Sequence, residues 1–350
     1  GQDVDASCIQ TMQANGHRGI AGDIRQITSE EILQKADMKA GEPFLICGGP
    51  PCQPFSTAGK RLGINDPRGS LFKEFVRMID EIRPRFFVME NVKGIMSSIL
   101  KDENGENTDK KVLDVVLEEF RRLNYKTVYG LVDAVNYGVP QFRERFVLIG
   151  SRDDENIFLP APTHFRVHQN PAYRWVTLGD TIKTLEDVEG ECASFSDGRL
   201  RFLRMVPEGG NWKDLPSDVL QEAMGGAYTS GGGKVGFYRR LSYAQPSPTV
   251  VTSPVQKATM MCHPTKDRPL SVAEYARIQQ FPDDWIFMGT TVDKYRQIGN
   301  AVPIGLARAI GQMLVAVANK DAEIVVKRTR GTSVHDKIQN AIRIGGMSKC

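Results

Sequence analysis

Residues 44–52 decide the fold class, and they read Phe44-Leu45-Ile46-Cys47-Gly48-Gly49-Pro50-Pro51-Cys52. An apolar run that ends at glycine and proline is typical of a buried strand followed by a tight turn. The pattern returns one step later, where the apolar run 86–89 is followed by Glu90 and Asn91. Strands buried on both faces read as continuous apolar runs of this kind, which indicates a parallel sheet with helices on both sides.

Two helices and two further strands extend this pattern. Residues 71–82 and 112–123 place their apolar side chains at helical spacing. Alternation of strand and helix predicts an α/β fold with a doubly wound, mostly parallel, Rossmann-like sheet. The last two strands, 127–132 and 146–149, are joined by a loop too short for a helix, so we expect them to pair antiparallel.

The middle of the chain has a different composition. A length of 350 residues favours two domains. The middle is rich in Pro, Gly, Thr and Ser, which predicts a smaller, irregular, β-rich domain. Helical spacing returns at 271–281 and at 304–318, and we expect the second of these helices to pack against the first domain. The expected divisions are 1–155 for the first domain, 156–284 for the second, 285–319 for the returning helices and 320–350 for a basic, solvated tail.

Composition excludes several classes of protein. The net charge is +3, from 45 basic and 42 acidic residues, which excludes a histone-like polycation but leaves room for a local basic cleft. No apolar run reaches the roughly 18 residues of a membrane helix. The six cysteines contain no Cys-x-x-Cys pair and the five histidines are dispersed, so we expect free thiols, a reducing compartment and no metal site.

Two candidate catalytic residues follow the first two strands. In doubly wound sheets ligands bind beyond the carboxyl ends of the strands, which is where Cys52 and Glu90 fall. A cysteine nucleophile with a neighbouring carboxylic acid suggests covalent attack with proton assistance, because burial at a strand end raises the pKa of a carboxyl group. Cys52 could instead be a buried structural cysteine, and Glu90 could be a helix cap or an ion-pair partner.

A third candidate is the run Gln141-Phe142-Arg143-Glu144-Arg145 before the last strand. Arg143 and Arg145 are two residues apart, so in an extended chain they project to one face. Such a pair suits recognition of oxygen or phosphate, and the alternative is an ion-paired strand end.

Four motifs occur in a fixed order along the chain: Pro51-Cys52-Gln53, Glu90-Asn91-Val92, the arginine run at 141–145, and Gly299-Asn300-Ala301-Val302-Pro303. Together they resemble the ordered motifs of DNA cytosine-5 methyltransferases over about residues 1–318, most closely the bacterial restriction–modification type. The resemblance implies a monomeric bacterial cytoplasmic enzyme that methylates double-stranded DNA at a specific site.

The resemblance assigns roles to the catalytic candidates. Cys52 would attack C6 of a cytosine that is flipped out of the duplex. Glu90 would protonate or hydrogen-bond N3 of the base, and Asn91 would position this acid. Arg143 and Arg145 match the pair near the cytosine, with Arg145 on the base oxygen.

The resemblance also implies the cofactor S-adenosyl-L-methionine. Asp3 would bind the ribose hydroxyls and Val4 would pack on the adenine. The full set of matching positions is Asp3, Val4, Asp23, Ile24, Pro51, Leu71, Asn300 and Val302.

The Phe-x-Gly-x-Gly motif that should precede Asp3 is not in this sequence. Three explanations are open. The sequence is an incomplete copy of the enzyme, a second polypeptide supplies the missing strand, or the protein is a degenerate paralogue that still binds DNA.

Target choice is expected between about 155 and 250, where the glycine-rich and cationic run 231–240 could also be only a flexible loop. The candidate DNA contacts are Gln53, Ser56, Lys60, Arg61, Lys234, Tyr238, Arg239, Arg240 and Thr249. Two rival functions stay open. One is a tRNA cytosine-5 methyltransferase, although its Cys-Phe-Thr signature is absent, and the other is a non-catalytic DNA-binding subunit of a split enzyme.

Overall fold

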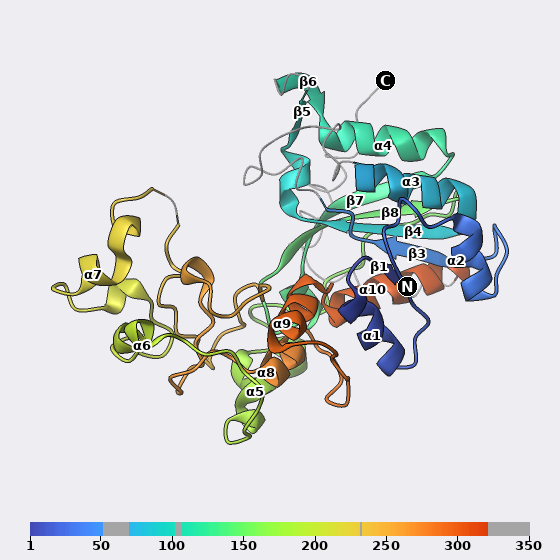
Figure 1. The fold of residues 1–350 in the computed structure, drawn as a ribbon. Helices are drawn as coiled ribbons and strands as arrows, with labels where there is room; N and C mark the ends of the chain where they lie inside the picture. The colour runs from blue at the N-terminus through green and yellow to red at the C-terminus, as the bar shows by residue number, and fades with distance from the viewer. Residues whose placement is uncertain (52–69, 102–106, 232, 321–350) are drawn as a thin grey trace.

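The computed structural model describes residues 1–51, 70–101, 107–231 and 233–320. Figure 1 shows a larger body built around a sheet and a smaller lobe that carries α6 and α7. The sites predicted at Cys52, Gln53, Ser56, Lys60 and Arg61, and the predicted tail after residue 320, lie outside the described residues.

The main sheet contains β3 (Leu45–Gly48), β4 (Phe86–Asn91), β7 (Lys126–Asp133) and β8 (Glu144–Ser151), in the order β3-β4-β8-β7. β3 pairs with β4 in parallel, and β8 is antiparallel to both β4 and β7. β3, β4 and β7 therefore run in one direction and β8 runs against them. The predicted α/β sheet and its antiparallel last pair are confirmed. The sequence did not show that β8 inserts between β4 and β7.

Helices cover both faces of this sheet. α3 (Ser70–Ile82) and α4 (Val112–Arg122) lie on one face and α10 (Ile304–Ala318) on the other (Figure 1). Alternate residues of β4 point to opposite faces. Phe87 packs on the α3–α4 side, where its ring stacks on Phe120 at 4.2 Å between centroids. The expected helices at 71–82, 112–123 and 304–318 are therefore confirmed, and so is the return of the last one to the sheet.

Several short elements were not predicted, because they are too short to show a period in the sequence. At the amino end, β1 (Gln2–Asp3) pairs in parallel with β2 (Ile20–Ala21). Their neighbours are α1 (Ala6–Ala14) and α2 (Ser29–Ala36), which are capped by Asp5 and Thr28. The remaining short strands are β5 (Ile99–Lys101) and β6 (Asn107–Lys111).

The smaller lobe is irregular, as predicted, but the prediction that it is β-rich was wrong. It contains α5 (Leu178–Ile182), α6 (Asp197–Leu203) and α7 (Leu220–Met224), and between 152 and 290 the described residues form only isolated bridges, such as Arg240 with Cys262. Pro, Gly, Ser and Thr favour turns as well as strand ends, so composition could not separate the two. Short 3-10 helices occur in the chain at Lys93–Met96, Ala134–Tyr137, Pro171–Tyr173, Lys183–Leu185, Trp212–Asp214, Gly225–Ala227 and Lys257–Thr259.

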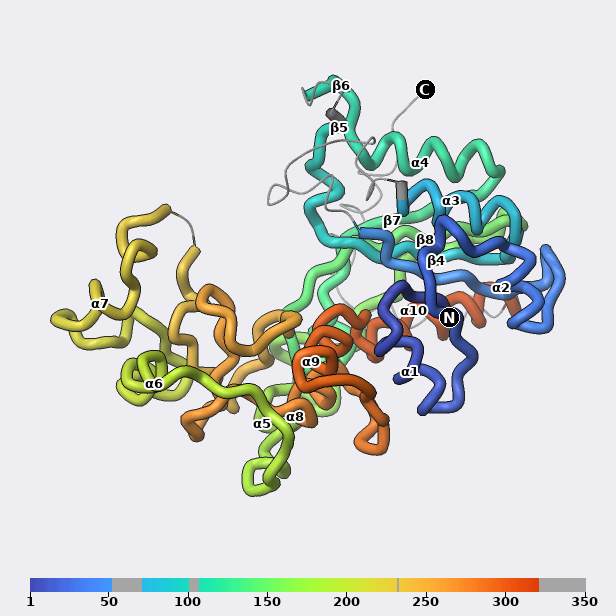
Figure 2. The backbone as a smooth tube through the Cα atoms, in the orientation of Figure 1, coloured from blue at the N-terminus to red at the C-terminus, as the bar shows by residue number. Residues whose placement is uncertain are grey.

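α8 (Val272–Ile278) and α9 (Thr291–Asn300) join the two parts of the molecule. Figure 2 shows the chain leaving the sheet after β8, building the smaller lobe and returning through these helices to α10. Capping boxes begin both helices, from Ser271 and from Thr290. Side chains of α5, α8 and α9 share one apolar core, so residues on both sides of the expected division at 284 pack together.

The stretch Thr291–Ala318 is long and apolar enough to span a membrane by length and composition alone, which the sequence expectation did not anticipate. In the structure it is two helices, α9 and α10, on either side of Pro303. α10 buries Leu306 and Leu314 completely against the sheet, which is the packing of a core helix.

A pair of glycine substitutions tests the packing of the sheet. A Cβ added to Gly150 on β8 would lie 1.9 Å from the Phe87 ring, whereas one added to Gly311 on α10 would meet nothing within 4 Å. Gly150→Ala should lower the free energy of unfolding by about 1–3 kcal/mol, because it overfills the core. Gly311→Ala should raise it by about 0.5–1 kcal/mol, because alanine favours helix. Urea unfolding checks both, and equal effects in the two variants would contradict the packing.

Candidate active site

An acid–arginine pair lies at the carboxyl edge of the sheet. Glu90, the penultimate residue of β4, lies opposite Val147, and Arg145 precedes Val147 by two residues on β8, so the Glu90 and Arg145 side chains are diagonal neighbours on one face. Arg145 Nε lies 2.7 Å from Glu90 Oε1, and the side chains are 14% and 18% exposed. The structure therefore brings together the acid and the second arginine that the sequence singled out.

Burial is the main influence on the pKa of Glu90. Burial raises the pKa of Glu90 above its usual value, and the neighbouring Arg145 and Arg143 only partly oppose this rise. Oε1 accepts from Arg145, whereas Oε2 lies 3.3 Å from the position of a Cβ added to Gly49. A proton on Glu90 would therefore sit on the oxygen that faces the loop leading to residue 52.

Asn91 fixes that same loop. It is 7% exposed, and its Nδ2 donates to the Pro50 carbonyl oxygen at 2.9 Å. Its Oδ1 accepts from the Val92 backbone N–H at 2.8 Å. Asn91 thus holds the end of β4 against the segment before Cys52, a contact that sequence reasoning missed when it expected Asn91 to act on the acid alone.

Arg143 is a buried connector between distant segments. It is 3% exposed and donates from Nη1 to the Val250 carbonyl and from Nη2 to the Gly299 carbonyl, both at 2.8 Å. Burial lowers the pKa of Arg143, and the nearby Arg145 lowers it further. Both terminal nitrogens of its guanidinium donate to these carbonyls, so of the two arginines Arg145, with a 14% exposed side chain, is the more accessible.

Two buried glutamines extend this connection and were not singled out from the sequence. Gln141 is completely buried, donates to Gln279 Oε1 at 2.6 Å and accepts from the Val250 N–H at 3.1 Å. Gln279 donates to the carbonyls of Ile298 and Ala301 at 2.6 and 3.0 Å. Gln141 lies within the motif at 141–145, which was a usable signal. Gln279, at the end of a helix, gave none.

Gly299 is required by close backbone contact. A Cβ at this position would lie 2.6 Å from the backbone carbon of Val251, so a side chain does not fit there. The close approach lets the Gly299 carbonyl reach Arg143 and places Asn300 at the edge of the sheet.

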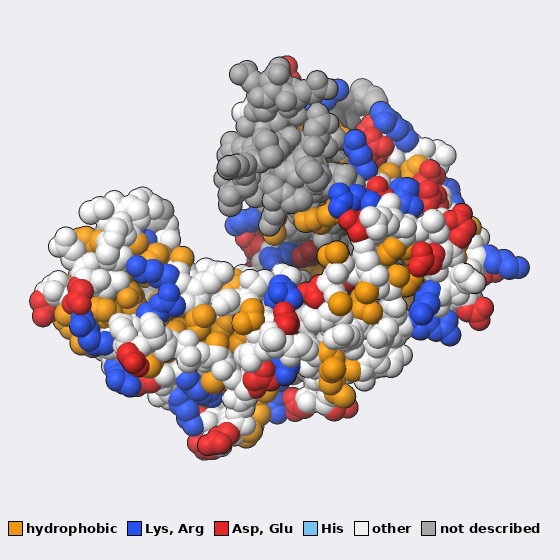
Figure 3. All heavy atoms as spheres, in the orientation of Figure 1, with side chains coloured by type: hydrophobic (Ala, Val, Ile, Leu, Met, Phe, Trp, Pro, Cys, Tyr) orange, Lys and Arg blue, Asp and Glu red, His pale blue; other side chains and the backbone are white. Residues whose placement is uncertain are grey.

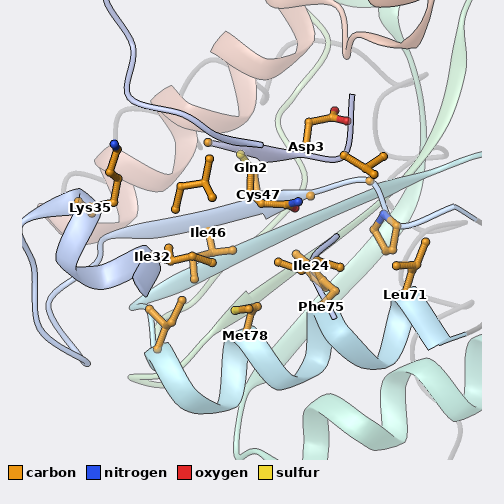
Figure 4. Close-up of a pocket in the computed structure, with 18 of the residues that line it drawn as sticks. Gln2, Asp3, Ile24, Ile32, Lys35, Ile46, Cys47, Leu71, Phe75 and Met78 are labelled. Carbon is orange, nitrogen blue, oxygen red and sulfur yellow. The ribbon is translucent and has the colours of Figure 1, made fainter. Parts of the chain in front are cut away.

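A cavity of about 900 Å³ lies between β1, β3 and α3 (Figure 4). Asp3 is at one side of it, and its Oδ1 accepts from the Asp5 N–H at 2.8 Å. The expected cofactor residues that line it are Asp3, Val4, Asp23, Ile24, Pro51, Leu71 and Asn300. Val302 is the exception: it packs with the α10 core on the other face of the sheet, because the chain turns there into that helix.

Two arginines hold the acids near this cavity. Arg25 donates to the Asp23 carboxylate and lowers its pKa to about 2. Arg296 on α9 lies 2.5 Å from Asp5, the residue whose backbone N–H holds Asp3. α9 thus contacts Asp5 through Arg296, and Arg143 through the carbonyl of Gly299.

The residues expected to contact DNA from the smaller lobe divide into two groups. Arg240 is 5% exposed and donates to carbonyls of Leu203 and Val206 and to Asp267, so its prediction as a DNA contact is corrected: it holds the lobe together. Tyr238 is 4% exposed and donates to the Ala223 carbonyl, so it too is a structural residue.

The other three DNA candidates are more accessible. Lys234 is half-buried over the Trp212 ring. Arg239 is half-buried and donates to the Met260 carbonyl, and Thr249 donates to the carbonyl of Phe142 next to Arg143. Figure 3 shows a deep hollow between the smaller lobe and the body, with Lys and Arg side chains on the lobe beside it. Among the described residues, no group of three His, Cys, Asp or Glu side chains could hold a metal ion.

This fold is that of methyltransferases. A prophage-encoded DNA modification methyltransferase of E. coli matches with a TM-score of 0.60 at 24% identity, covering 91% of this chain and 92% of that one. The S. pombe Dnmt2 methyltransferase matches with a TM-score of 0.53 at 16% identity, covering 91% and 90%.

The chain belongs to the C-5 cytosine-specific DNA methylase family, whose profile matches residues 1–316. The type II methyltransferase M.PspPI of Psychrobacter sp. (strain TA137) is 40% identical, over 90% of this chain and 73% of that protein. M.Sau96I of Staphylococcus aureus is 38% identical, over 91% and 70%.

The burial of Glu90 predicts a pH-dependent difference between the wild type and Glu90→Gln. The pKa of Glu90 is raised in the folded state. Below about pH 4.5 the acid is therefore protonated in both the folded and the unfolded protein, and the difference in unfolding free energy between wild type and variant does not change with pH. As the pH rises through the raised pKa, the wild type must ionise a buried acid and loses stability relative to the variant. Urea unfolding from acid to neutral pH measures this difference. An unfolding free energy of the wild type that increases relative to that of the variant as the pH rises would contradict the prediction.

Proposed function

We propose that this chain is a site-specific DNA methyltransferase of a bacterial restriction–modification system, acting in the cytoplasm as a monomer. It transfers a methyl group from S-adenosyl-L-methionine to C5 of a flipped-out cytosine, through a covalent bond to Cys52. The observation that carries the proposal is the Glu90–Arg145 pair, since the acid has a raised pKa and faces the loop before Cys52.

The residues act on the base in sequence. Cys52 loses its thiol proton to solvent, and the thiolate forms a bond from sulfur to C6 while the electrons of the C5–C6 double bond move into the ring. Glu90 donates its proton to N3, which neutralises the charge that develops there. Arg145 keeps that acid oriented and contacts the base oxygen. After methylation, a base removes the C5 proton and the electrons of that bond restore the C5–C6 double bond as the Cys52 sulfur leaves as the thiolate. The N3 proton returns to Glu90.

The residues around the cavity fit the proposed cofactor. The carboxylate of Asp3 suits a pair of ribose hydroxyls, and the apolar side chains of Val4, Ile24 and Leu71 suit a flat purine ring. Val4 is 74% exposed, which leaves an apolar surface for a ligand to cover. Bound S-adenosyl-L-methionine would supply an electrophilic methyl group. Pro51 and Asn300 both line the cavity, and Pro51 directly precedes Cys52 in the chain.

The hollow between the lobes would hold the DNA. We assign residues 156–284 to target recognition and the sheet body to catalysis. Lys234, Arg239 and Thr249 remain candidates for contacts to DNA from the recognition side. Flipping the cytosine costs a few kcal/mol, which contacts in the hollow must offset.

A covalent trap tests the catalytic proposal. Duplex DNA with 5-fluorocytosine at the target site should form an adduct that resists denaturation, because fluorine at C5 blocks the final loss of a proton. Cys52→Ser should form none, and Glu90→Gln should form it about 100-fold more slowly. Wild type incubated with the cofactor that gives no adduct would sink the catalytic proposal and favour a non-catalytic DNA-binding subunit.

The same trap separates DNA from RNA as the substrate. A tRNA cytosine-5 methyltransferase would form the adduct with 5-fluorocytosine RNA instead. Likeness to the Dnmt2 structure shows the fold alone and does not favour this rival.

A charge-only substitution tests the cofactor site. Asp3→Asn keeps an oxygen for the Asp5 N–H but loses the charge, so affinity for S-adenosyl-L-methionine should fall about 10- to 100-fold, the effect of a charged hydrogen bond. Asp187→Asn, at a 99% exposed side chain, is the control and should bind normally. Calorimetric titration measures both, and equal affinities would remove Asp3 from the site.

A further inference from the structure

A compact loop, residues 163–175, lies where the chain passes from the sheet body to the smaller lobe, and one residue holds both of its ends. The Asn136 carbonyl accepts from the backbone N–H groups of Thr163 and His164 at 2.8 and 2.9 Å. The Asn136 side-chain Oδ1 accepts from Trp175 Nε1 at 3.0 Å. Because both ends are fixed in this way, the 163–175 loop is already positioned before any partner binds, which lowers the entropy cost of binding.

The base of the 163–175 loop lies beside the acid–arginine pair. The Trp175 ring packs edge-on against the ring of Phe142, with 5.4 Å between centroids. Asn136 belongs to the 3-10 helix Ala134–Tyr137, which follows β7 at the carboxyl edge of the sheet. Phe142 is three residues from Arg145, and three residues of extended chain span about 11 Å at most. The loop therefore begins and ends next to the edge that carries the proposed catalytic acid.

The 163–175 loop is cationic. No Asp or Glu occurs between 156 and 179, whereas Arg166 and Arg174 both lie in this stretch and are exposed. Within the described residues neither arginine forms an ion pair, and Arg174 Nε donates to a backbone carbonyl of the loop at 2.9 Å. The two exposed arginines at the end of α4, by contrast, pair with glutamates of the same helix. The loop thus presents two positive charges that no described acid neutralises.

Exposed aromatic rings accompany these charges. Phe165 is 38% exposed and Tyr173 is 48% exposed. The His168 ring lies between them, stacked on Phe165 at 5.8 Å and edge-on to Tyr173 at 5.1 Å between centroids. Arginine pairs with phosphate, and aromatic rings pack on sugars and on unstacked bases. Cations interleaved with exposed rings therefore suit a sugar–phosphate backbone better than an acidic protein surface, which offers charge alone.

We propose that the 163–175 loop binds the sugar–phosphate backbone of the DNA beside the flipped cytosine, with Arg166 and Arg174 on phosphates and Tyr173 packed against the strand. This inference rests on the proposed function. A nucleotide that leaves the duplex stays joined to its strand, so the phosphates next to it remain near the acid–arginine pair. The loop begins the segment assigned to target recognition, but phosphate contacts position the duplex and carry no base sequence.

The salt dependence of DNA binding tests this assignment. Anisotropy of a fluorescently labelled duplex of mixed sequence gives the binding constant over a range of salt concentrations. Each phosphate contact adds about 0.9 to the slope of log K against log salt, because it releases counterions. The double variant Arg166→Gln with Arg174→Gln should lower that slope by about 2, and should weaken binding in about 0.1 M salt by about tenfold or more.

A matched control removes two exposed charges elsewhere. Arg121→Gln with Arg122→Gln changes the end of α4, which lies beside Arg83 at the opposite edge of the sheet, and should leave the slope unchanged. Tyr173→Ala should weaken binding about fivefold without changing the slope, because it removes packing and no charge. Urea unfolding of each variant checks that it is folded.

The outcomes separate this inference from the proposed function. An unchanged slope in the loop double variant, or an equal fall in the α4 control, overturns the assignment of the loop. The 5-fluorocytosine adduct of the wild type tests methyl transfer independently. Adduct formation together with an unchanged slope in the loop variant therefore overturns this inference and leaves the proposed function standing.

Discussion

The structure depends on one buried cation, the guanidinium of Arg143. Hydrogen bonds stabilise a buried charge, and Arg143 donates from Nη1 and Nη2 to the carbonyls of Val250 and Gly299, while its buried Nε has no hydrogen-bond partner among the described residues. Those carbonyls belong to the smaller lobe and to α9, so the last strand of the sheet is fixed to both. Gly299 reaches Arg143 only because it has no side chain, and Gln141 reinforces the same junction through Val250.

This junction lies next to the Glu90–Arg145 pair. Arg145 lies on β8, two residues after Arg143, and pairs with Glu90. Burial raises the pKa of this acid, and the arginine holds one of its oxygens. Neither burial alone nor pairing alone would suit a proton donor. A buried acid without a partner has no fixed side-chain orientation, and an exposed acid paired with arginine would be ionised. The combination gives an acid whose pKa is raised and whose Oε1 is held in place by Arg145.

The sequence predicted the parts of the molecule that repeat a period or a motif. Apolar runs predicted β3 and β4, and helical spacing predicted α3, α4 and α10. The resemblance carried by the ordered motifs implied that Glu90 and Arg145 lie near each other, as they do. The sequence could not predict the role of Gln279, because its hydrogen-bond partner Gln141 is 138 residues away. It also could not predict that Arg240 is buried, because an arginine in a glycine-rich run is typical of an exposed cation. The helical lobe was mistaken for β structure because its composition encodes turns without a period.

α9 connects three parts of the molecule: the cavity side, the acid–arginine pair and the smaller lobe. Arg296 at its middle holds Asp5, whose backbone positions Asp3, while Gly299 at its end accepts from Arg143. α9 also shares an apolar core with α5 and α8 of the smaller lobe. α9 therefore links the smaller lobe both to the Asp3–Asp5 turn at the cavity and to Arg143 beside the Glu90–Arg145 pair. The net charge of the whole chain is only +3, so the Lys and Arg side chains on the lobe beside the hollow are a local feature and not part of a generally basic surface.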